Sequence, residues 1–177
     1  AFDVFDFNGD ITDAFATMYG LSEEEVTALN SAAKETNEQL FRIVRENSQI
    51  SVDDSGTLNV FIPPFEGAEN LYSGILDTFK ETLGDERFSD FLDLGERSLR
   101  EKFHEFGGEN LEVKISTHEK TVTSEDGLIK TEKRYEVSER STKDGQSTTR
   151  TLNSITEDKL AEDFYLINRL IESEPKQ

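Results

Sequence analysis

Residues 111–153 read LEVKISTHEKTVTSEDGLIKTEKRYEVSERSTKDGQSTTRTLN, and this stretch decides the fold. Polar and apolar residues alternate along it, which is typical of strands with one buried face. Two Asp-Gly pairs, at 126–127 and 144–145, interrupt the alternation, and Asp-Gly is a strong signal for a tight hairpin turn. The stretch therefore predicts a three-stranded antiparallel meander.

The register of the first hairpin follows from its charges. A three-residue loop at 125–127 pairs Glu119 with Lys133 and Lys120 with Glu132. A two-residue loop would instead set Lys120 against Lys133, and like charges directly opposite each other destabilise a sheet. We therefore predict the three-residue loop.

The second hairpin favours a two-residue loop at 144–145. That register sets Val137 opposite Leu152 and Glu139 opposite Arg150. The strand ends far from the core are so polar that we expect them to project as a solvated ribbon.

Residues 49–62 predict one more hairpin. Its loop at 54–56 ends in a glycine, which suits a three-residue turn, and this register sets Ile50 opposite Val60. One antiparallel sheet can collect both strand regions.

The rest of the chain carries helix signals. Ser22 and Glu25 have capping-box spacing, and a glycine follows several apolar stripes. We expect helices over 12–19, 22–46, 66–84, 85–106 and 156–173. The expected class is α+β: an N-terminal hairpin plus a C-terminal meander in one antiparallel sheet, with about four helices packed on one face.

The length of 177 residues fits a single domain over 1–177. Its aromatic-rich segment 1–20 is expected to pack on the body, and residues 174–177 are expected to fray.

The charge of the chain narrows its partners. The sequence holds 38 acidic and 19 basic residues, for a net charge of −19. Such a surface repels phosphate backbones and anionic lipids, so we expect no nucleic-acid partner and, without a long apolar run, no membrane insertion. A protein partner, basic in character, fits better.

The chain contains no cysteine, which excludes disulfides, thiolate metal sites and cysteine nucleophiles. It opens at Ala1, and we expect an exported protein, periplasmic or extracellular, that has lost its signal.

Asp6, Asn8 and Asp10 supply oxygen ligands at alternate positions. This arrangement resembles the start of an EF-hand or dockerin loop, and the resemblance implies calcium. Ile11 stands where such a loop has glycine, and Thr17 stands where it has a bidentate acid. The alternative is a surface turn.

Other metal candidates have ordinary explanations. Asp53 and Asp54 are common turn residues beside a glycine. His104 and His118 are the two histidines, and no third zinc ligand accompanies them. We predict surface positions for both histidines.

Two acid pairs, Asp90/Asp93 and Glu101/Glu105, have helical spacing. Paired carboxylates carry out acid–base chemistry when burial separates their pKa values. The alternative is a solvated helix face with arginine neighbours.

No known catalytic or cofactor motif occurs, and we expect no cofactor. The leading hypothesis is a non-enzymatic binding or accessory domain that acts through protein contacts, because a neutral sheet edge can accept a partner strand. A carboxylate-based hydrolase or lyase and a homodimeric structural protein remain as alternatives.

Overall fold

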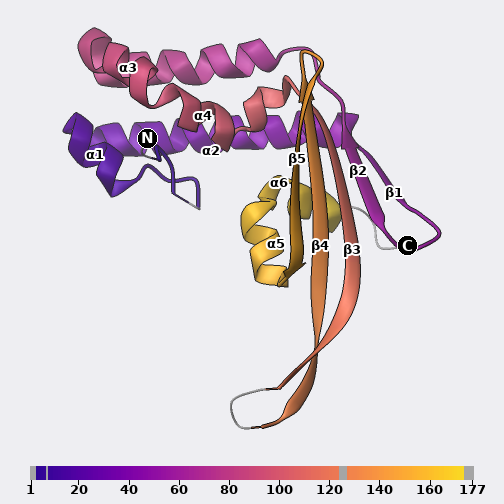
Figure 1. Cartoon of the computed structure of the whole chain (residues 1–177). Coiled ribbons are helices and arrows are strands. Elements are labelled where there is room, and N and C mark those ends of the chain that lie inside the picture. Colours follow the sequence, from indigo (N-terminus) through magenta and orange to yellow (C-terminus); the bar gives the residue numbers. More distant parts are fainter. Residues whose placement is uncertain (1–2, 7, 124–126, 174–177) are drawn as a thin grey trace. The chain divides into compact units, whose positions relative to one another are not determined.

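The structure, a computed structural model, describes residues 3–6, 8–123 and 127–173 (Figure 1). Its helices are α1 (Asp13–Tyr19), α2 (Glu23–Asn47), α3 (Ala68–Leu94), α4 (Glu96–Lys102), the 3₁₀ turn η1 (His104–Gly107), α5 (Glu157–Asp163) and α6 (Tyr165–Ser173). Its strands are β1 (Gln49–Val52), β2 (Leu58–Ile62), β3 (Asn110–Thr123), β4 (Ile129–Lys143) and β5 (Gln146–Ile155). The predicted α+β class is confirmed.

The chain divides into two compact units. The helical unit comprises Ala1–Glu46 and Pro64–Gly108, and the sheet unit comprises Asn47–Pro63 and Glu109–Gln177. The expectation of one domain over 1–177 stays a prediction. The expected layer of about four helices differs from the structure, which has six α-helices among the described residues, and only α5 and α6 fall wholly in the sheet unit.

The sheet unit is built on one five-stranded antiparallel sheet with the order β1-β2-β3-β4-β5. The register predicted from charge pairing is confirmed, because Lys120 lies opposite Glu132 and Glu139 lies opposite Arg150. Of the first loop, Glu125 and Asp126 lie outside the described residues.

The turn between β4 and β5 shows why Asp-Gly is needed there. Asp144 has φ 51° and Gly145 has φ 76°, and aspartate and glycine tolerate such values best. Positive φ at both central residues gives a hairpin the twist of its strands. The register slips once, between Tyr135 and Val137, and the sequence did not predict this irregularity.

The N-terminal hairpin also has the predicted register, with Ile50 opposite Val60. Its turn is closed by Asp53, whose side chain accepts hydrogen bonds from the backbone N–H groups of Ser55 and Thr57 at 2.9 and 3.0 Å. The hydrogen bond from the Ser55 hydroxyl, followed by these backbone bonds, holds the pKa of Asp53 below its usual value.

One face of the sheet is apolar. Val113, Ile115 and Val137 are almost fully buried, and Leu160 and Phe164 at α5 are buried as well. Burying one such side chain stabilises a fold by about 1.5–3 kcal/mol. The helix expected over 156–173 divides at Phe164 into α5 and α6.

The helical unit has an aromatic core. Phe5 contacts Phe79 and Phe103 edge-on at centroid distances of 6.2 and 5.8 Å. Phe15 contacts Phe91 in the same way at 6.0 Å. Such edge-to-face pairs add about 0.5–1.5 kcal/mol each beyond their buried area.

The helix start predicted at Ser22 is confirmed as a capping box. Ser22 N–H donates to Glu25 at 2.8 Å, and Glu25 N–H donates to Ser22 Oγ at 3.2 Å. Thr36, a polar residue of this helix, is buried together with its apolar side chains.

The stop predicted at Gly84 takes the form of a break inside α3. Gly84 has φ 72° and ψ 168°, so the helical hydrogen bonding is interrupted there. Gly95 separates α3 from α4. Among the described residues, no helix has the length and apolar character that crossing a bilayer requires.

Candidate functional site

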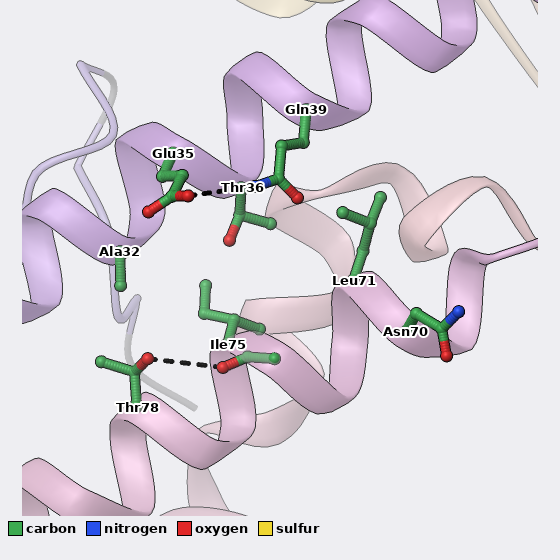
Figure 2. Close-up of a pocket in the computed structure, with 9 residues that line it drawn as sticks. Ala32, Glu35, Thr36, Gln39, Asn70, Leu71, Ile75 and Thr78 are labelled. Carbon is green, nitrogen blue, oxygen red and sulfur yellow. Dashed lines mark hydrogen bonds between the residues drawn. The ribbon is translucent and has the colours of Figure 1, made fainter.

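A groove lies between α2 and α3 in the helical unit (Figure 2). It has a volume of about 170 Å³. We name it the α2–α3 groove and define it by the residues that line it: Ala32, Glu35, Thr36, Gln39, Asn70, Leu71, Gly74, Ile75 and Thr78.

Small residues leave the groove open. Gly74 has no side chain, and a Cβ added there would meet nothing within 4 Å. Ala32 contributes one methyl group from α2. Glycine inside a helix costs about 0.5–1 kcal/mol relative to alanine, so packing gives no reason for glycine at this position.

Oxygen atoms dominate the polar lining. Gln39 Nε2 donates to Glu35 Oε1 at 3.1 Å, which leaves the Gln39 carbonyl oxygen as an acceptor. Thr36 is only 8% exposed, and its hydroxyl, which Figure 2 shows directed into the groove, makes no hydrogen bond to a described residue. Thr78 Oγ1 donates weakly to Gly74 O at 3.4 Å.

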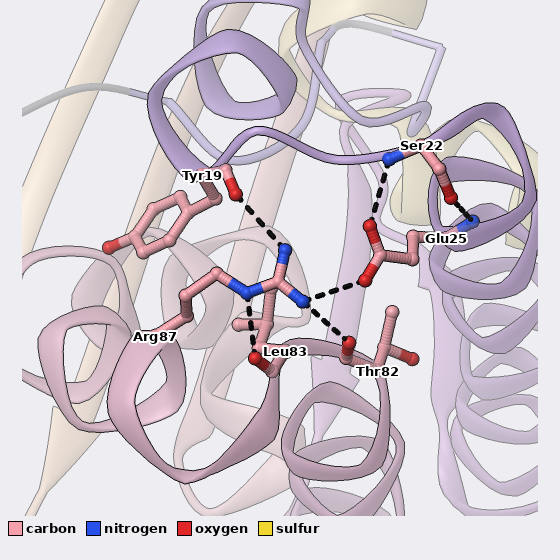
Figure 3. A network of polar contacts seen from close by, with 6 residues as sticks. All are labelled: Tyr19, Ser22, Glu25, Thr82, Leu83 and Arg87. Atoms are coloured by element: carbon pink, nitrogen blue, oxygen red, sulfur yellow. Dashed lines mark hydrogen bonds and ion pairs between the residues drawn. The ribbon is translucent and has the colours of Figure 1, made fainter.

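A second polar cluster surrounds Arg87 (Figure 3). The Arg87 guanidinium donates to the carbonyl oxygens of Leu83 at 2.7 Å, Tyr19 at 3.1 Å and Thr82 at 3.2 Å. It also forms an ion pair of 2.7 Å with Glu25. Three carbonyls and a carboxylate thus surround one half-buried cation.

The Arg87 cluster has a structural role. Thr82 and Leu83 precede the break at Gly84, and the last carbonyls of a helix segment lack helical donors. The hydrogen bond from Arg87 is the main cause that lowers the pKa of Glu25, so this acid stays charged and holds its partner.

Tyr72, Glu96 and Arg100 form a third cluster in the helical unit. Tyr72 Oη donates to Glu96, and the Arg100 guanidinium carbon lies 3.8 Å from the centre of the Tyr72 ring. Burial, followed by the bond to Glu96, raises the pKa of Tyr72 to about 12. The tyrosine therefore stays protonated and ties α3 to α4.

The sheet unit brings together an acid pair that the sequence did not predict. Glu139 is half-buried, and burial raises its pKa; Arg150 lowers it and Glu109 raises it further. Ser141 Oγ donates to Glu109, and Arg150 also pairs with Asp163 at 3.1 Å. The cross-strand position of Glu139 is readable from the register, but its burial depends on α5.

Part of the sheet has two strands only. β2 pairs with β3 as far as Leu58 opposite Ile115, and β5 pairs with β4 as far as Ile155 opposite Tyr135. Beyond these points, residues 118–123 of β3 pair solely with residues 129–134 of β4 among the described strands. We call these two segments the ribbon.

The ribbon has no core of its own. None of its residues is buried, and at its end Leu128 and Ile129 are 57% and 74% exposed. It carries four basic and two acidic residues, a net charge of +2 in a chain of −19.

The residues of the predicted calcium loop close a turn. Asp6 N–H donates to Asp10 O at 2.7 Å, and Asp10 N–H donates to Asp6 Oδ1 at 2.9 Å. The Lys102 ammonium donates to Asp6 O at 3.1 Å, so a cation already lies beside the turn. Calcium binding at Asp6, Asn8 and Asp10 stays a prediction, and calorimetric titration tests it.

The other predicted metal ligands are dispersed. His118 is exposed on the ribbon opposite Arg134, and the side chain of His104 lies outside the description. Asp54 is exposed in the β1–β2 turn. In the described part of the chain, no three His, Cys, Asp or Glu side chains are grouped to hold a metal ion.

The predicted acid pairs lie on the surface of the helical unit. Asp90 and Asp93 are exposed, and Glu101 pairs with Arg97 at 2.7 Å on an exposed helix face. Glu105 is half-buried in η1. The structure does not gather these four acids around a cavity that it describes.

Comparison of the chain with protein-family models, with curated proteins and with solved structures returns no match.

Proposed function

We propose that this chain is a non-enzymatic protein-binding domain whose contact element is the ribbon. The observation that carries the proposal is a two-stranded extension of the sheet whose two outer edges pair with no other described strand. A two-stranded hairpin alone is marginally stable in water, because it buries little apolar surface. A partner would supply that missing burial.

The occupant we propose is an extended segment of another protein that pairs with the open edge of β3. Natural edge strands avoid such pairing through charged residues, proline or bulges. Within the ribbon, β4 carries four charged residues, Lys130, Glu132, Lys133 and Arg134, whereas β3 carries only Glu119 and Lys120. The β3 edge thus has fewer charged residues that would oppose the addition of a strand.

The apolar end of the ribbon supports the same role. Leu128 and Ile129 lie next to the first loop and are largely exposed. Hydrophobic anchors at the centre of a contact contribute most of the binding free energy in many interfaces. We expect a partner to cover both side chains.

The proposal is tested by shortening the ribbon. In the variant, Asn-Gly replaces residues 118–134 and joins Thr117 to Tyr135, which already lie opposite each other. Wild-type and shortened chains serve as baits at 50 mM and 500 mM NaCl. We expect the wild type to retain a partner that the shortened chain loses; equal retention by both, or none at low salt, contradicts the proposal.

One observation favours the alternative of a carboxylate hydrolase or lyase. Glu109 and Glu139 are candidates for an acid–base pair, because burial and the charge of Glu109 both raise the pKa of Glu139. A Glu139→Gln variant that loses the partner-independent hydrolysis of a substrate panel would favour the enzyme. The homodimer alternative is tested by sedimentation at micromolar concentration.

A further inference from the structure

The α2–α3 groove presents acceptors and few donors. Glu35, Thr36 and Gln39 direct oxygen atoms toward it, and the only amide donor of Gln39 with a described partner is directed at Glu35 (Figure 2). The Thr36 hydroxyl is the decisive atom, because Thr36 is only 8% exposed and Figure 2 shows its hydroxyl directed into the groove without a hydrogen bond to a described residue. A ligand that donates hydrogen bonds can pair with this oxygen.

The charge around the groove selects a cation. The helical unit holds 21 acidic and 8 basic residues, a net charge of −13. The Glu35 carboxylate adds a local negative charge at the groove itself. The charge therefore disfavours anionic ligands and steers cationic ligands toward the helical unit.

The volume and the apolar lining of the groove suit a ligand with an aliphatic chain. A volume of about 170 Å³ lies below the roughly 300–1,000 Å³ of sites for drug-sized molecules, so it suits one long side chain. Ile75, 2% exposed, and Leu71 give the groove apolar surface. Methylene groups pack on such a surface while a charged end group reaches the polar atoms.

We propose that the α2–α3 groove binds a guanidinium group carried on an aliphatic stem, as in an arginine side chain. A guanidinium has five N–H donors in one plane and no acceptor, which matches the carboxylate of Glu35 and the oxygens of Thr36 and Gln39. It is also less strongly hydrated than an ammonium, so entry into a half-closed groove costs less. This site lies in the helical unit and does not depend on the role of the ribbon.

The test is an NMR titration of the full chain with N-acetyl-arginine methylamide, with the citrulline analogue as the control probe. Citrulline has nearly the same shape but no charge and fewer donors. We expect backbone amide shifts centred on Thr36 and Gly74, and at least tenfold weaker binding of the citrulline analogue. Agmatine is a second probe: tighter binding of agmatine points to a free small molecule, and tighter binding of the arginine derivative points to a protein side chain.

Three variants separate the groove from general charge effects. Glu35→Gln and Thr36→Val each remove one acceptor, and we expect each to weaken binding of the arginine probe severalfold. Glu38→Gln removes the same charge from an exposed position of α2 that does not line the groove, and we expect no change. Absence of shifts at the groove, equal binding of the two probes, or equal losses in Glu35→Gln and Glu38→Gln would overturn the proposal.

Discussion

Arg87 satisfies backbone carbonyls that the break at Gly84 leaves without helical donors. Its planar guanidinium reaches four oxygens at once, and a lysine ammonium at the same place has three donors in a different geometry. The Arg87→Lys variant should therefore lose most of the stabilisation that the Arg87 hydrogen bonds give to the helix break. We expect the free energy of unfolding to fall by roughly 2–4 kcal/mol, because buried acceptors are left unpaired.

Urea denaturation measures this change. The matched control is Arg97→Lys, since Arg97 is 88% exposed and pairs with Glu101 along a helix face. The control should unfold at the wild-type urea concentration. Equal midpoints for all three chains would show that the Arg87 cluster does not hold the helix break.

Glu139 should make stability depend on pH in an unusual direction. Its pKa is raised, mainly by burial, so the folded state disfavours its charged form. As the pH rises through the folded pKa, this group lowers stability; as the pH falls, protonation relieves the cost. The facing groups are Glu109, which adds repulsion, and Arg150, which also pairs with Asp163 and partly offsets it.

The Glu139→Gln variant tests this assignment through melting temperatures between pH 5 and pH 8. We expect the variant to gain stability over the wild type at pH 8 and to lose that advantage toward pH 5. A constant difference in melting temperature across this pH range would mean that folding does not shift the pKa of Glu139.

At the scale of elements, one glycine in the α2–α3 groove should affect both the stability of α3 and the binding of the arginine probe. Gly74 lies inside α3, and an added Cβ would meet no atom within 4 Å. Gly74→Ala should raise the free energy of unfolding by about 0.5–1 kcal/mol, because alanine loses less conformational freedom in a helix. The same methyl group narrows the groove and should weaken binding of the arginine probe.

Chemical denaturation and the NMR titration measure the two effects on one protein. A stabilised variant with unchanged binding would mean that the probe does not enter beside Gly74. A destabilised variant would mean that the helix is not regular at this residue.

The ribbon is an element whose stability should be low when the chain is alone. Its six cross-strand residue pairs do not cover a buried core, so local opening of the ribbon costs little free energy. We expect amides of 118–123 and 129–134 to exchange with deuterium much faster than amides of 111–115 in the same strand. Uniform protection along β3 would contradict the description of the ribbon as an unsupported extension.

At the scale of the whole molecule, the sequence predicted the features that local interactions determine, such as turns and strand register. Cross-strand charges and Asp-Gly turns fix register locally, so the sequence is sufficient to predict the pairs Lys120–Glu132 and Glu139–Arg150. The division into two units could not be predicted, because apolar stripes do not encode their partners. The N-terminal segment, α1 and α3 bury phenylalanines against one another, as the contacts of Phe5 and Phe15 with Phe79 and Phe91 show.

The α2–α3 groove and the Arg87 cluster could not be predicted from the sequence for the same reason. Thr36 is a polar residue of α2, and its burial depends on how α3 packs on α2. Arg87 is half-buried, and this position depends on the break at Gly84. Both roles follow from tertiary contacts that spacing along the chain does not carry.

The net charge of −19 should make the whole chain more stable in salt. Like charges repel one another most in the compact state, and ions screen that repulsion. We expect the melting temperature to rise between 10 mM and 300 mM NaCl. A fall would mean that favourable ion pairs outweigh the repulsion.

The most direct test of the binding proposal is site-specific photocrosslinking in a native extract. A photoreactive amino acid replaces Thr121 in the ribbon or, as the control, the exposed Asp93 on α3. We predict a crosslinked partner from position 121 and none from position 93. A partner captured from position 93 alone would contradict the assignment of the ribbon as the contact element.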